Sequence, residues 1–223
     1  MILSKRAIAE RLPRPVLSVA SRCLWTLDQR FISLSPAALP VIQRAIREAP
    51  AGDYYEFGCF RGWLLLQAQK ALPAERAVWG FDSFQGLPPT DAPDFVQGQF
   101  AADLATVRRK LARGGFDFER GGLIKGFFEE SLTPALRAER PFAPAAVVMV
   151  DCDLGSGTTA ALRWLEEGLL QPGSVILLDD WHTGGGQREA FEAWFAGSRW
   201  RRRRFAEWPK HGVGWQLGPP QTA

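Results

Sequence analysis

The sequence predicts an α/β fold in which helices cover both faces of a mostly parallel sheet. From residue 53 onward, short strand-like runs alternate with helical segments, the pattern of a doubly wound fold. The runs at 145–150 and 174–178 are apolar at nearly every position, as strands buried on both faces are. The 223 residues, 46% of them hydrophobic, suffice for one domain with a sizeable core.

Residues 1–50 are expected to form a helical N-terminal extension, either a cap over the substrate or a dimer contact. Residues 5–30 have a helical pattern that two prolines interrupt. A second helix is expected to run to about residue 48, because Ser35 is a natural N-cap and Pro36 suits a first helical turn.

Residues 51–223 are expected to form the main domain. The expected strands are 53–57, 77–81, 123–126, 145–150, 174–178, 200–208 and 213–217. The expected helices are 63–72, 102–112, 158–168 and 187–195, with a helical turn at 131–138. The last two strands flank a turn and would form an antiparallel C-terminal hairpin at the edge of a seven-stranded Rossmann-like sheet. The long stretch 83–100, rich in proline, is either a lid over a site or a plain surface insertion.

Composition narrows the function classes. The net charge of +3 is too weak to indicate nucleic acid as a partner. No apolar run approaches the ~18 residues of a membrane span, and no secretory h-region follows the N-terminal basic residues. The three cysteines show no metal-binding spacing and are expected to be buried free thiols. We therefore expect a cytoplasmic protein with neither a membrane nor a nucleic-acid partner.

The turn after the first strand has the features of a ligand-binding loop. In the segment that starts at Glu56, two glycines, Gly58 and Gly62, let the backbone approach a ligand closely. Their spacing is not GxGxxG, which favours a smaller carboxylate-bearing or nucleoside ligand over a pyrophosphate. Arg61 would pair with a carboxylate of that ligand; the alternative is a structural turn with a solvated arginine.

The next two strand ends indicate an adenosine-bearing cofactor. Asp82 ends the second strand, where nucleotide-binding sheets place a carboxylate that binds ribose hydroxyls. Phe127 follows the third strand and either flanks an adenine ring or packs in the core.

Four acids follow the fourth and fifth strands: Asp151 and Asp153, then Asp179 and Asp180. Carboxylate oxygens at neighbouring strand ends favour a Mg²⁺, Mn²⁺ or Ca²⁺ site over helix capping by ordinary surface acids. His182 comes next and is either a general base or a surface histidine.

Several segments together resemble the macrocin O-methyltransferase family of class I S-adenosylmethionine-dependent methyltransferases. They are E-F-G-C-F-R-G, F-D-S-F-Q-G-L-P-P, V-D-C-D-L and P-G-S-V-I-L-L-D-D-W, spread over residues 53–195. The resemblance implies methylation of a hydroxyl on a small metabolite or glycoside, with a small hydroxylated molecule as substrate. The helical N-terminal extension is the expected contact of a possible homodimer.

The resemblance also implies a set of site residues. Asp151, Asp179 and Asp180 would bind Mg²⁺, and Asp151 would thereby take part in catalysis. His182 is the candidate catalytic base because it directly follows the metal acids, not because of the resemblance. The S-adenosylmethionine site would be lined by Glu56, Gly58, Cys59, Arg61, Asp82, Ser83 and Phe127. Two alternatives stay open: a metal-independent methyltransferase acting on nitrogen or another centre, and a non-catalytic protein that binds S-adenosylmethionine.

The basic run 201–204 has two interpretations. Alternating charges on an edge strand would protect that edge from pairing with another chain, or the arginines would contact an anionic substrate group or a partner.

Overall fold

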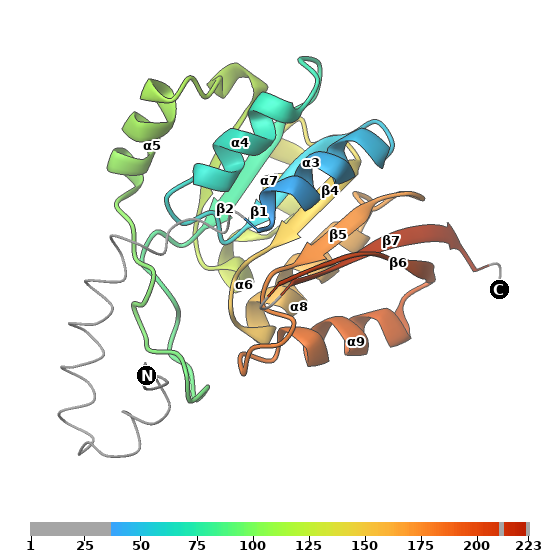
Figure 1. Ribbon diagram of the computed structural model, residues 1–223. Coiled ribbons are helices and arrows are strands. Elements are labelled where there is room, and N and C mark those ends of the chain that lie inside the picture. The colour runs from blue at the N-terminus through green and yellow to red at the C-terminus, as the bar shows by residue number, and fades with distance from the viewer. Residues whose placement is uncertain (1–36, 210–211, 222–223) are drawn as a thin grey trace, which may run out of the picture. The chain divides into compact units, whose positions relative to one another are not determined.

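A computed structural model describes residues 37–209 and 212–221, and Figure 1 shows their arrangement. Most of the expected N-terminal extension, the helical segment 5–30 and residues 210–211 of the expected hairpin turn lie outside these residues. Among the described helices, none is long and apolar enough to cross a lipid bilayer.

A seven-stranded sheet with the order β3-β2-β1-β4-β5-β7-β6 forms the centre of the fold. Strands β1 to β5 pair in parallel, and β6 and β7 add an antiparallel hairpin beyond β5. The predicted fold class is therefore confirmed. The strands are β1 Asp53–Phe57, β2 Val78–Asp82, β3 Gly121–Lys125, β4 Ala145–Val150, β5 Val175–Leu178, β6 Trp200–Trp208 and β7 Gly212–Pro220.

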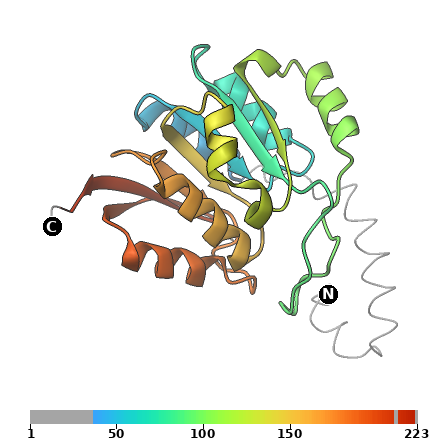
Figure 2. The ribbon, with the colours of Figure 1, turned by 180° about the vertical axis from the view of Figure 1, so that it is seen from behind.

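Helices cover both faces of this sheet, as the views from the front and from behind show (Figures 1 and 2). Side chains from α3, α4 and α5 pack in one core cluster, and those from α6, α8 and α9 pack in the other. Neighbouring strand residues alternate between the two clusters, as the pleat requires: Tyr54 joins the first and Tyr55 the second. The helices are α3 Leu39–Glu48, α4 Trp63–Ala71, α5 Leu104–Arg113, α6 Phe128–Ser131, α7 Pro134–Glu139, α8 Gly155–Glu166 and α9 Gln187–Gly197, with a 3₁₀ turn at Phe118–Arg120.

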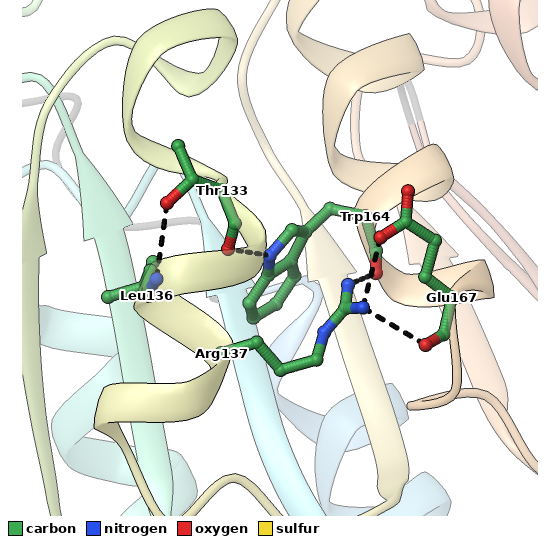
Figure 3. A network of polar contacts seen from close by, with 5 residues as sticks. All are labelled: Thr133, Leu136, Arg137, Trp164 and Glu167. Carbon is green, nitrogen blue, oxygen red and sulfur yellow. Dashed lines mark hydrogen bonds and ion pairs between the residues drawn. The ribbon is translucent and has the colours of Figure 1, made fainter.

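The expected helical turn at 131–138 is in fact two short helices, α6 and α7. Pro134 cannot continue α6, but it suits the first turn of α7. Thr133 caps α7 by accepting the backbone N–H of Leu136 at 3.1 Å (Figure 3). The next turn brings Arg137 to the C-terminus of α8, where it donates to the carbonyl oxygens of Trp164 and Glu167. This contact fixes the helical layer at the edge of the sheet where the parallel strands begin.

The stretch 83–100 contains neither helix nor strand, in agreement with the expected loop. Its two ends are held together because the N–H of Leu87 donates to Gln99 and the N–H of Gly98 donates back to Leu87, at 2.8 and 2.9 Å. Two backbone hydrogen bonds therefore close the loop at its base.

Candidate active site

The residues expected to form the site lie at one edge of the sheet. Because β1, β2, β4 and β5 run parallel, their carboxyl ends meet there. β1 lies between β2 and β4, so the turn predicted to hold a cofactor is adjacent to the loop that carries the first acids. The two halves of the predicted site are thus neighbours in space.

Gly58 occupies the point where these two halves touch. Its backbone φ is +90°, and a Cβ atom there would lie 1.8 Å from the carbonyl oxygen of Asp151. Its N–H donates to the carbonyl oxygen of Phe81 on β2, at 2.8 Å. A side chain at this position would push the two loops apart, so glycine is required by both conformation and space.

Asp82 shapes the loops on either side of it. Its carboxylate accepts the N–H groups of Phe60 and Phe84, each at 2.7 Å. Both phenylalanines have positive φ, 46° and 55°, a conformation that is uncommon for bulky residues. Burial raises the pKa of Asp82 above its ordinary value, and the two N–H donors oppose that rise. Asp82 therefore holds the strained turns after β1 and β2 in place.

Glu56 is a buried carboxylic acid beside Asp82. Burial raises its pKa to about 8, the hydroxyl of Tyr54 lowers it, and the charge of Asp82 raises it again. The Tyr54 hydroxyl donates to Glu56 Oε2 at 2.8 Å. Sequence reasoning missed Tyr54, although residues two apart on a strand share a face and the spacing was a usable signal.

The remaining residues predicted for the cofactor lie around these two acids. Cys59 is buried, and the Arg61 guanidinium lies 4.8 Å from the centre of the Phe60 ring. Ser83 closes the turn after β2 by donating from its hydroxyl to the carbonyl oxygen of Gly86, at 2.8 Å. Phe127 immediately precedes α6 and is half-buried, whereas the next residue packs in the core.

Asp151, Asp179 and Asp180 form a compact group of carboxylates. One carboxylate oxygen from each lies within 4.8 Å of the others. Burial, and then the charge of Asp179, raise the pKa of Asp180 to about 7. Burial and the same neighbouring acids raise the pKa of Asp151 well above its ordinary value. We call these three residues the acid triad. Its members repel one another, and a bound cation would relieve that repulsion.

Asp153 lies outside the acid triad. Its backbone N–H donates to Asp180 Oδ2 at 3.0 Å, and burial together with the charges of Asp180 and Asp179 raises the pKa of its side chain well above the ordinary value. The residue has a φ of 62°, in the left-handed region. The conformation is strained, and it aims the N–H at the triad.

Two side chains that sequence reasoning missed hold the triad. Gln187, the first residue of α9, is fully buried; it accepts the N–H of Asp180 at 2.8 Å and donates to the carbonyl oxygen of Val150 at 3.2 Å. Trp208, the last residue of β6, donates its indole N–H to Asp179 Oδ1 at 2.9 Å. No sequence motif marks either residue, because each reaches the triad through the packing of separate elements.

His182 lies at the rim of the triad. Its Nε2 is 3.8 Å from a carboxylate oxygen of Glu207, and its side chain is about half exposed. The glycines that follow pack closely against neighbouring loops: a Cβ on Gly185 would lie 1.7 Å from the carbonyl oxygen of Asp153, and one on Gly184 would lie 3.0 Å from the Asp94 carboxylate. The loop 83–100 therefore lies against the segment that follows the triad.

The strand order, the antiparallel C-terminal hairpin and the ligand-type turns at the carboxyl edge define a class I methyltransferase fold. The chain belongs to the macrocin-O-methyltransferase (TylF) family, whose model matches residues 28–203. The family resemblance expected from the sequence is thus confirmed.

Two relatives show what kinds of enzyme the chain is similar to. It is 31% identical over 156 residues to mycinamicin III 3''-O-methyltransferase from Micromonospora griseorubida, covering 63% of this chain and 59% of that protein. It is 29% identical over 154 residues to 8-demethyl-8-(2,3-dimethoxy-alpha-L-rhamnosyl)-tetracenomycin-C 4'-O-methyltransferase from Streptomyces olivaceus, covering 63% and 57% of the two chains. The chain therefore spans less than two thirds of the length of either relative.

Solved structures support the same fold. The calicheamicin methyltransferase CalS11 superposes with a TM-score of 0.68 at 21% identity, covering 98% of this chain and 95% of that one. The O-methyltransferase NovP gives a TM-score of 0.66 at 22% identity, covering 82% and 80%.

Proposed function

We propose that the protein transfers a methyl group from S-adenosylmethionine to a hydroxyl group of a small glycosylated metabolite, with Mg²⁺ held by the acid triad. The observation that carries this proposal is the convergence of three carboxylate oxygens within 4.8 Å at the sheet edge, beside a turn suited to a cofactor. The names of the two relatives specify O-methylation, one at a 3'' position and one at the 4' position of a rhamnosyl compound. These names favour a sugar hydroxyl as the acceptor.

The acid triad fits a small hard cation. Carboxylate oxygens are the ligands that Mg²⁺ prefers, and Mg²⁺ commonly keeps waters and leaves room for substrate oxygens. The raised pKa of Asp180, about 7, reflects burial and the charge of Asp179, both of which a cation would offset. When bound, Mg²⁺ would supply Lewis-acid chemistry to an acceptor oxygen.

The cofactor would lie over β1 and β2. Gly58 would let the backbone of the turn after β1 approach the ligand. Asp82 would accept hydrogen bonds from the ribose hydroxyls through the lone pairs that the N–H groups of Phe60 and Phe84 leave available. Arg61 would pair with the carboxylate of S-adenosylmethionine, and Phe127 would flank the adenine ring. Glu56 would form the floor of the same site, together with Cys59 and Ser83.

The acceptor would lie over β4 and β5, between the acid triad and the loop 83–100. His182 is our candidate for the base that takes the hydroxyl proton, because it follows the triad directly and is exposed to an incoming substrate. Asp151 would help to position the acceptor. With both substrates aligned, the activated methyl group leaves positioning as the main task of the protein.

Three measurements test this proposal. Calorimetry with S-adenosylhomocysteine tests whether the cofactor site exists, and absence of binding would contradict the proposal. Transfer of a labelled methyl group to mycinamicin III or a rhamnosylated tetracenomycin tests the acceptor class.

The third measurement tests the metal: activity should disappear with EDTA and return with Mg²⁺. Activity that is indifferent to EDTA would instead favour a metal-independent methyltransferase.

A further inference from the structure

The hydrogen bond between Trp208 and Asp179 joins two parts of the sheet that are not adjacent strands. Asp179 directly follows β5, whereas Trp208 ends β6, and β7 lies between those strands. Leu178 on β5 pairs with Val213 on β7, and Trp208 pairs with Gly212. Asp179, Gly212 and Trp208 therefore form a row across the sheet, and the indole must pass over β7 to reach the carboxylate.

Gly212 provides the space for that passage. A Cβ atom at Gly212 would lie 1.6 Å from Cε2 of the Trp208 indole, far inside van der Waals contact. Its backbone is outside the left-handed region, so the need for glycine here is one of space and not of conformation. Any side chain at this position would displace the indole from its contact with Asp179.

The indole is well suited to fixing a carboxylate. It can only donate a hydrogen bond, it has just two side-chain torsions, and burial among the core residues holds it in place. Its N–H donates to Asp179 Oδ1 at 2.9 Å, which restrains the position of that oxygen. Partners of this type, bonded to a metal ligand but not to the metal, orient the ligand and tune its affinity.

We propose that Trp208 is a positioning residue for Asp179 as a metal ligand, and that Gly212 exists to let the indole reach it. The inference rests on the proposed function, since it gives the acid triad a cation. It assigns the C-terminal hairpin, which contributes no acid to the triad, a part in organising the site. The contact between Glu207, the preceding residue, and His182 brings the same end of β6 to the candidate base.

The test compares Trp208→Phe with Trp194→Phe, a control matched in chemistry and burial. Trp194 also donates its indole N–H to a carboxylate, Glu166 Oε2 at 2.8 Å, but it does so between α9 and α8. The measured quantity is the affinity of the full-length protein for Mn²⁺. It is obtained from the decrease of the free Mn²⁺ signal in electron paramagnetic resonance as the ion binds. Trp208→Phe should weaken binding about 10- to 100-fold, and Trp194→Phe should leave it unchanged. Thermal melts without metal show whether both variants fold.

Gly212→Ala supplies an independent variant, with Gly197→Ala as its control because a Cβ at Gly197 meets no atom within 4 Å. Gly212→Ala should weaken Mn²⁺ binding about as much as Trp208→Phe, and combining the two should add little, since both remove the same contact.

If Trp208→Phe binds Mn²⁺ like the wild type while Asp179→Asn does not, Trp208 is only a packing residue and the inference is overturned. If the wild type itself binds no Mn²⁺, the metal role in the proposed function fails as well.

Discussion

The two ends of strand β1 hold buried carboxylates in different ways. Asp53, its first residue, accepts three N–H groups, from Ala77, Ala143 and the indole of Trp79, at 2.9 to 3.1 Å. Glu56, three residues later, lies beside the charge of Asp82, and burial raises its pKa to about 8. The edge where the parallel strands begin, which holds Asp53, is thus organised for stability. The edge where they end, which holds Glu56, is organised to receive a ligand.

Backbone strain follows the same division. Among the described residues, four that are not glycine have positive φ: Phe60, Phe84, Phe100 and Asp153. Three of them lie in turns after β1, β2 and β4, and the fourth ends the loop 83–100. Strain of this kind costs about 1–3 kcal/mol per residue and persists where function requires a particular conformation. At the opposite edge, three N–H donors satisfy the carboxylate of Asp53, and Arg137 donates to the carbonyl oxygens of Trp164 and Glu167.

The largest expected effect comes from the acid triad. Asp151→Asn should lower methyl transfer at least about 1,000-fold, equivalent to ~4 kcal/mol of transition-state stabilisation. The same change should leave the melting temperature of the metal-free protein unchanged or raise it, because it removes a carboxyl group whose ionised form burial and the charges of Asp179 and Asp180 disfavour. Steady-state kinetics and calorimetry measure the two effects. A marked loss of stability would contradict the proposed division between the edges.

The opposite result is expected for Asp53, the first residue of β1: a loss of stability without a loss of ligand binding. Asp53→Asn should lower the free energy of unfolding by about 2–3 kcal/mol, because the amide nitrogen would face N–H donors that the carboxylate now accepts. Affinity for S-adenosylhomocysteine should stay unchanged at a temperature where the variant is folded. Chemical denaturation, with the exposed Glu75→Gln as control, measures the effect. A variant as stable as the wild type would show that Asp53 is not a structural acid.

The dependence of stability on pH sharpens the comparison. A carboxyl whose folded pKa is raised, as that of Glu56 is to about 8, binds its proton more tightly in the folded state. Its contribution to stability is complete below the unfolded value and is lost as pH rises through the folded value. Between pH 5 and 8 the wild type should lose on the order of 4 kcal/mol of stability through this group, and Glu56→Gln should abolish that loss. Denaturation curves across this range test the sign; an unchanged slope would mean that Glu56 is ionised in the folded protein.

The smallest effect is expected at the contact between α7 and α8. Arg137→Ala should cost about 1 kcal/mol of stability, because it removes hydrogen bonds to the last carbonyl groups of α8 and stacking on Trp164 (Figure 3). Neither cofactor nor Mn²⁺ affinity should change. The exposed Arg140→Ala is the matched control. Weaker ligand binding in Arg137→Ala alone would show that the two edges are coupled.

Much of the fold was predictable because the central strands β4 and β5 are continuous apolar runs, and parallel strands carry the residues after them to one edge. The carboxylates of Asp151, Asp179 and Asp180 could be brought together from this rule alone. Trp208 could not, because its contact depends on the register of the β6–β7 hairpin, which shifts between Arg204 and Ala206. Such a shift depends on tertiary packing and leaves no pattern in the sequence.

The arginine run shows the same limit. β6 does lie at the edge of the sheet, as expected. Arg202, however, is not an exposed edge charge. Its guanidinium lies over the rings of Phe195 and Trp215, 4.1 and 4.2 Å from their centres, and it pairs with Glu192 at 2.7 Å. Alternation predicted the edge strand but not which arginine would fold back against α9.

The central claim is that the carboxyl edge of the sheet holds a divalent ion through the acid triad. A crystal of the protein grown with S-adenosylhomocysteine and Mn²⁺, measured at the manganese absorption edge, tests it most directly. We predict one anomalous peak coordinated by carboxylate oxygens of Asp151, Asp179 and Asp180. No peak at the triad, in crystals that show the bound cofactor product over β1 and β2, would contradict the account.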